Sequence, residues 1–93
     1  MTNSEIKKPI ANSQMQLEII TPETTLFKSN EVQLVQLPGK DGSFEVMDQH
    51  APLISILKKG RIKVVGKDAS PQFYDIQGGV IEILRNHVLI LAE

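Results

Sequence analysis

Apolar and polar residues alternate along several short stretches of the chain. Residues 15–19, 61–64 and 73–77 each show the alternation. A repeat of two residues is the period of a strand with one buried face. These stretches therefore predict β-strands rather than helices.

Proline and glycine divide the chain from residue 15 onward into pieces of strand length. They stand at Pro22, Pro38, Gly39, Gly42, Pro52, Gly60, Gly66, Pro71, Gly78 and Gly79. The pair Asp41-Gly42 separates the apolar runs Val32–Leu37 and Phe44–Met47. Because Asp-Gly favours tight hairpin turns, these two runs are predicted to form a hairpin.

The last stretch, Val80 to Glu93, is compatible with two structures. Apolar residues fall at helical spacing, at Ile81, Leu84, Val88 and Leu91. A helix would leave other apolar side chains on its remaining faces. Residues 85–87, Arg-Asn-His, interrupt the apolar pattern where a hairpin would turn. We favour the hairpin.

The composition supports a β fold. Valine and isoleucine total 18, whereas alanine occurs four times, and β-branched residues fit strands better than helices. We predict an all-β fold, a two-sheet antiparallel β-sandwich of about ten short strands. Residues 15–93 form this domain. Residues 1–14 show no apolar period and are interpreted as a disordered leader or a vector-derived remnant.

The side-chain chemistry argues against an enzyme. The chain has no cysteine, and neither His50 nor His87 lies in a metal-ligand spacing. Nucleophile elbows and phosphate-binding loops are also missing from the sequence. We predict no catalytic residues, no cofactor and no metal. A net charge of −1 lacks the basic footprint of a nucleic-acid binder, and no apolar run approaches the roughly 20 residues of a membrane span.

Two segments carry alternative interpretations. Residues 47–53 place His50 and Pro52 in a loop between apolar strands. His50 either hydrogen-bonds the backbone to stiffen this loop or contacts a partner. Gly78-Gly79 either forms a bulge or tight bend, or marks the close approach of another backbone.

Four segments of residues 15–93 together resemble a known family. They read MQLEIITPETTLF, EVQLVQLPGKDGSFEV, DQHAPLISILKKGRIKV and QGGVIEILRNHVLILAE. In this order they resemble the epsilon subunit of F-type rotary ATP synthases. The resemblance implies the N-terminal β-sandwich of that subunit. It also implies a non-catalytic part of the central stalk, which couples the proteolipid ring to the gamma subunit during proton-driven ATP synthesis.

The resemblance also implies two contact surfaces. Thr21, His50 and Ser55 resemble positions that face the gamma subunit, and Leu53 between them would supply apolar contact. Apolar side chains are expected to be exposed around His50, Leu53 and Ser55. The loop that meets the proteolipid ring corresponds to Gly39, Lys40, Asp41, Gly42 and Ser43. Ser43 stands where some members carry an acidic residue.

Family members usually continue into a helical hairpin that inhibits ATP hydrolysis, whereas this chain stops at Glu93. The chain is either a natural short form or the sandwich expressed alone, and in both cases it is expected to act without helix-mediated inhibition. It would be held at the cytoplasmic face of the bacterial plasma membrane only through the complex. Two alternatives remain: an unrelated β-sandwich that serves as a protein-binding adaptor, and a small jelly-roll enzyme.

Overall fold

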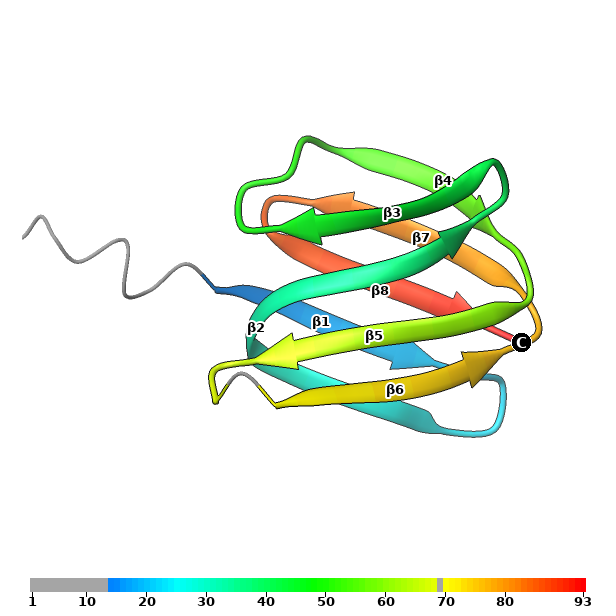
Figure 1. Cartoon of the computed structure of the whole chain (residues 1–93), viewed down its shortest axis with the longest axis horizontal. Helices are drawn as coiled ribbons and strands as arrows, with labels where there is room; N and C mark the ends of the chain where they lie inside the picture. The colour runs from blue at the N-terminus through cyan, green and yellow to red at the C-terminus, as the bar shows by residue number, and fades with distance from the viewer. Residues whose placement is uncertain (1–13, 69) are drawn as a thin grey trace, which may run out of the picture.

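The computed structural model describes residues 14–68 and 70–93, which form eight strands and no helix (Figure 1). The interpretation of residues 1–14 as a leader falls, apart from Gln14, outside the described residues. The strands are β1 (Met15–Ile20), β2 (Thr25–Gly39), β3 (Gly42–Met47), β4 (Leu53–Leu57), β5 (Gly60–Gly66), β6 (Pro71–Ile76), β7 (Gly79–Leu84) and β8 (His87–Ala92).

The strands lie in two layers, as Figure 1 shows. One layer has the order β1-β8-β7-β4, and the other contains β3, β5, β6 and the second half of β2. Strand β2 belongs to both layers. Its first half pairs with β1, and its second half pairs with β3 and β5. An irregularity in the β2–β5 register between Val32 and Leu34 lies where β2 passes from one layer to the other.

The all-β sandwich is confirmed, with two corrections in detail. The described residues form eight strands rather than about ten, because residues 25–39 run as one 15-residue strand. The sheets are also not wholly antiparallel, since β1 and β8 pair in parallel. The β7–β8 hairpin makes β8 antiparallel to β7. Strand β8 then runs in the same direction as β1, its neighbour on the other side.

Both predicted hairpins form. Strands β7 and β8 meet at Arg85 and Asn86, whose φ angles of 51° and 63° are those of a tight two-residue turn. The helical alternative for this segment is therefore wrong. In the β2–β3 hairpin the two loop residues are Lys40 and Asp41, one position earlier than expected. Gly42 already belongs to β3 and pairs with Gly39.

The core lies between the layers and, among the described residues, contains only apolar side chains. It follows the predicted two-residue period, most clearly in β1, β7 and β8. The side chains that are fully buried or nearly so are Met15, Leu17, Ile19, Val32, Val35, Leu37, Val46, Leu57, Ile62, Val64, Ile76, Ile81, Ile83, Val88, Ile90 and Ala92.

Gly79 begins β7 where the backbone of β8 comes unusually close. Its φ is 157°, and a Cβ at this position would overlap the carbonyl oxygen of Leu91. The bend interpretation of the Gly78-Gly79 pair is therefore confirmed at Gly79. The bend needs glycine angles, and the approaching backbone is another strand of the same chain.

Candidate partner-binding surface

Strand β4 carries apolar side chains on both of its faces. Leu57 is buried, and Leu53 is half-buried against the core. Between them Ile54 and Ile56 point to the other side, with 73% and 56% of their surface exposed. Exposed apolar side chains are informative when they adjoin one another, whereas single ones are normal on a protein surface.

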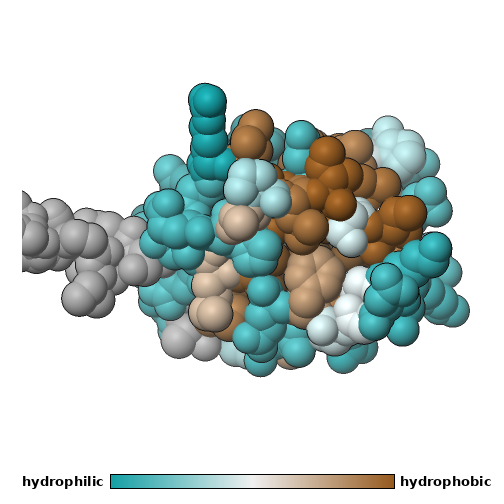
Figure 2. Space-filling view, turned by 90° about the horizontal axis from the view of Figure 1, so that it is seen from above, coloured by the Kyte–Doolittle hydropathy of each residue, from teal (hydrophilic) through white to brown (hydrophobic). Residues whose placement is uncertain are grey.

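Neighbouring strands extend these two isoleucines into a larger surface. Ile56 lies opposite Val80 on β7, and Val80 lies opposite Leu91 on β8. In the next row Ile54 lies opposite Glu82 on β7, and Glu82 lies opposite Leu89 on β8. We call the set Ile54, Ile56, Val80, Leu89 and Leu91 the apolar face. Figure 2 shows apolar side chains gathered in the right-hand half of the view, with hydrophilic ones around them.

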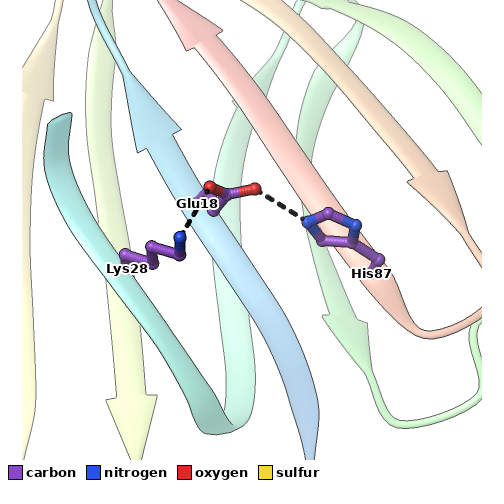
Figure 3. Close-up of polar contacts among 3 residues, drawn as sticks. All are labelled: Glu18, Lys28 and His87. Carbon is purple, nitrogen blue, oxygen red and sulfur yellow. Dashed lines mark hydrogen bonds and ion pairs between the residues drawn. The ribbon is translucent and has the colours of Figure 1, made fainter.

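A polar group borders the apolar face on β1 (Figure 3). The Glu18 carboxylate accepts a hydrogen bond from Nε2 of His87 at 3.0 Å, and its other oxygen lies 3.8 Å from Nζ of Lys28. Glu18 pairs across the sheet with Leu89 of the apolar face. Because these side chains remain partly exposed, each pair is worth no more than about 1 kcal/mol. Their main effect is to give the apolar face a hydrophilic edge.

Thr21 lies at one end of the apolar face, in the turn between β1 and β2. Its hydroxyl oxygen accepts from the backbone N–H of Thr24 at 3.1 Å, and its own N–H donates to the Thr24 carbonyl at 2.8 Å. A shallow hollow of about 740 Å³ connects Thr21 with Ile56, Val80 and Leu91. Thr21 thus borders the apolar face directly.

His50 lies at the opposite end, in the loop between β3 and β4. Its backbone N–H donates to the Met47 carbonyl at 3.2 Å, and its ring Nδ1 donates to the Ala51 carbonyl at 2.7 Å. Because a carbonyl only accepts, this bond places the proton on Nδ1. The structure therefore contains the hydrogen bond that the loop-stiffening interpretation of His50 requires.

The hairpin tip, residues 39–43, lies at the same end of the molecule as Thr21 (Figure 1). Lys40, Asp41 and Ser43 are exposed. Two backbone bonds fix the tip to the end of β4. Lys40 N–H donates to Ile56 at 3.0 Å, and Lys58 N–H donates to Pro38 at 2.9 Å. The tip is therefore polar, accessible and firmly attached.

The residues expected to face one partner are not gathered at one point. His50, Leu53 and Ser55 follow one another along the loop and β4, whereas Thr21 lies at the far end of that strand. Leu53 and Ser55 are half-buried. Exposed apolar surface does occur here, but Ile54 and Ile56 supply it.

Ile54 and Ile56 were missed by the sequence reasoning. The signal was available in LISIL, where a two-residue period leaves apolar side chains on both faces of the strand.

The part of the surface that the structure describes offers no cluster of reactive side chains. Among residues 14–68 and 70–93, no three His, Cys, Asp or Glu side chains gather as metal ligands would. Within the same ranges no helix is long and apolar enough to cross a membrane. What the described surface offers a partner is an apolar face with polar ends.

Comparison with known proteins identifies relatives over almost the whole chain. Residues 14–93 match the family model of the ATP synthase, Delta/Epsilon chain, beta-sandwich domain. The ATP synthase epsilon chain of Chlorobium limicola is 39% identical over 83 residues, which cover 89% of this chain and 93% of the relative. The epsilon chain of Roseiflexus sp. is 40% identical over 83% of this chain, a stretch that covers 54% of the longer relative.

Solved structures share the fold. A chain in the cryo-EM structure of the Euglena gracilis mitochondrial ATP synthase superposes with a TM-score of 0.81 at 20% identity, covering 86% of this chain and 51% of that one. A chain in the Tetrahymena thermophila structure of the central stalk and c-ring gives 0.74 at 13% identity, covering 84% and 62%.

An unrelated adaptor sandwich and a small jelly-roll enzyme do not account for such matches. The chain belongs to the delta/epsilon β-sandwich family of ATP synthase, as an epsilon chain and hence a non-catalytic subunit.

Proposed function

We propose that this chain works in the central stalk of a rotary ATP synthase, where it couples the proteolipid ring to the gamma subunit during proton-driven ATP synthesis. Family membership supports the proposal. So does the likeness in fold to a chain in a structure described as central stalk and c-ring. The mechanical role requires a stiff body with two binding surfaces. The wholly apolar described core and the two-layer strand network supply the stiffness.

The gamma subunit binds along β4 and the apolar face in this proposal. Thr21 and His50 mark the two ends of the contact, and Leu53 and Ser55 lie along it. Ile54 and Ile56 supply the apolar area. Adjoining exposed apolar side chains on a small domain are a common mark of a protein-binding site. The exposure of Ile54, at 73%, is the observation that carries this assignment.

The ring binds the hairpin tip, Gly39 to Ser43. The tip presents a lysine, an aspartate and a serine to solvent, a set that suits polar loops better than a lipid surface. Its two backbone bonds to β4 and its neighbour Lys58 would carry force from the ring into the sheet that holds the apolar face. Torque thus passes between two surfaces joined by one strand.

Two further parts belong to the proposal. The chain lies at the cytoplasmic face of the bacterial plasma membrane and is held there by its partners. Residues 14–68 and 70–93, which form strands and no helix, exert no helix-mediated inhibition of ATP hydrolysis in this proposal. Strong inhibition of a reconstituted complex by this chain would contradict the second part.

The affinity of the chain for the gamma subunit tests the proposed surface. Ile54→Lys places a charge where apolar contact is expected, and a central contact of this kind typically costs tenfold or more in affinity. Phe73→Lys is the matched control, because Phe73 is 52% exposed on β6, in the other layer. We expect the control to bind within about twofold of the unmodified chain. Equal affinities for both variants would overturn the assignment.

A further inference from the structure

The loop that carries His50 has an unusual backbone. Residues 48–52 connect β3 to β4, and Gln49 has a φ of 66°. A positive φ in a residue other than glycine costs roughly 1 kcal/mol or more, so that surrounding contacts must hold it. The bond from His50 N–H to Met47 closes the turn from within. The remaining support comes from outside the loop.

Asn86, in the β7–β8 turn, provides that support through its side-chain amide. Its Oδ1 accepts from the Gln49 N–H at 2.7 Å, and its Nδ2 donates to Oδ1 of Asp48 at 2.6 Å. Nδ2 also donates to the Gln14 carbonyl at 2.9 Å, and the Asn86 carbonyl accepts from Gln16 N–H at 3.0 Å. One residue therefore connects the His50 loop, the β7–β8 turn and the start of β1.

We propose that Asn86 is a positioning residue for partner binding: its amide holds the Asp48–His50 loop in the shape that presents His50 to the gamma subunit. This inference rests on the proposed function, in which the loop forms one end of the gamma contact. The amide reaches both the loop backbone, at Gln49, and the loop's first side chain, at Asp48. Both contacts lie within two residues of His50.

Asparagine suits this position for a chemical reason. The site needs one acceptor and two donors on a side chain short enough to reach both neighbours. It also needs tolerance of a φ of 63°, which asparagine has and most other residues lack. Aspartate would keep the acceptor but lose both donors, and would place a second carboxylate beside Asp48. Glycine would keep the backbone angle and lose the whole side chain.

Asn86→Gly tests the proposal in the full chain. We expect the affinity for the gamma subunit to fall about tenfold, because two hydrogen bonds that hold the loop are lost. Hydrogen exchange at the Gln49 N–H should accelerate by a similar factor. Arg85→Gly is the control, since Arg85 is the other residue of the same turn, is exposed and also has a positive φ. It should leave both quantities within about twofold.

A purely structural role would show in folding stability alone. Both variants are therefore also unfolded chemically, and affinity is measured where each is fully folded. Asn86→Asp should weaken binding as well, and adding Asp48→Asn should recover part of the loss. The introduced amide can then donate to the introduced carboxylate, which restores the bond between positions 48 and 86 with donor and acceptor exchanged. Weakened stability with unchanged affinity, or no recovery in the double variant, would overturn the proposal.

His50→Ala in the same assay separates this inference from the proposed function. If His50→Ala weakens binding and Asn86→Gly does not, the positioning role is wrong and the contact stands. If His50→Ala leaves the affinity unchanged, the loop is not part of the contact. The positioning role of Asn86 and the place of His50 in the gamma contact are then both wrong. We expect His50→Ala and Asn86→Gly to weaken binding, and their combination to cost less than the sum of the two.

Discussion

Substitution of Gly79 by alanine is expected to be the most damaging glycine change among those compared below. Its φ of 157° is strained for any residue with a Cβ, at about 1–3 kcal/mol. The added methyl group would also overlap the Leu91 carbonyl and meet Cα of Ala92 at 3.1 Å, so β8 must shift. Overpacking of this kind costs another 1–3 kcal/mol or so. Together the two effects predict a loss of roughly 2–6 kcal/mol in the free energy of unfolding.

Alanine substitutions at two other glycines separate the cost of backbone strain from the cost of steric overlap. Gly42→Ala has strain without overlap, because φ is 140° and no atom lies within 4 Å of the new Cβ. It should cost about 1–3 kcal/mol. Gly66→Ala has neither, since its Cβ would meet only the Glu31 carbonyl at 3.7 Å. It should be neutral or stabilise by up to about 1 kcal/mol, because alanine restricts the unfolded chain.

Urea unfolding of the three variants measures the series. A small domain loses about 1 kcal/mol of stability per molar urea, so that midpoints should differ by molar amounts. The expected order of stability is Gly66→Ala, then Gly42→Ala, then Gly79→Ala, which should have the lowest urea midpoint of the three. Equal midpoints for Gly79→Ala and Gly66→Ala would refute the close contact between β7 and β8. Equal midpoints for Gly42→Ala and Gly66→Ala would refute the strain argument.

The remaining predictions concern the core and the polar edge. Ile81→Ala, in the buried centre of β7, should lower the free energy of unfolding by about 2–5 kcal/mol. Ile56→Ala, at 56% exposure, should lower it by less than about 1 kcal/mol. The urea midpoints of the two variants check which side chain belongs to the core and which to the apolar face. Glu18→Gln should cost at most about 2 kcal/mol, or about 1 kcal/mol for each of its contacts with Lys28 and His87. A larger loss, or one that persists in high salt, would contradict the view of this group as a hydrophilic edge.

Local patterns in the sequence were enough to predict strands and turns. The alternation at residues 15–19 puts Leu17 and Ile19 in the core, as the structure has them. The interruption at Arg85 and Asn86 predicts the last hairpin, because a polar pair between two apolar runs favours a tight turn. These features depend on neighbouring residues alone, which is why sequence reasoning reaches them.

Features set by distant parts of the chain were not predicted. Parallel pairing of β1 with β8 depends on the path of all the strands between them. The exposed side of β4 was not predicted, because LISIL is apolar on both faces and only the neighbouring layer decides which face is buried. Thr21 and His50 were grouped on the resemblance alone, and their places at opposite ends of the sheet depend on how β1, β8, β7 and β4 pair. Asn86 was predicted only as a turn residue, without its contacts to the His50 loop.

Cross-linking in the assembled ATP synthase tests the central claim most directly, because the chain has no cysteine and each introduced cysteine is unique. Ile54→Cys, Ser43→Cys and Phe73→Cys place a thiol on the apolar face, on the hairpin tip and on β6 in the other layer. With a short reagent that carries a maleimide for the introduced thiol and a photoreactive group for the partner, we expect Ile54→Cys to link to the gamma subunit, Ser43→Cys to link to the proteolipid ring, and Phe73→Cys to link to neither. A gamma link from Phe73→Cys with none from Ile54→Cys would contradict the account.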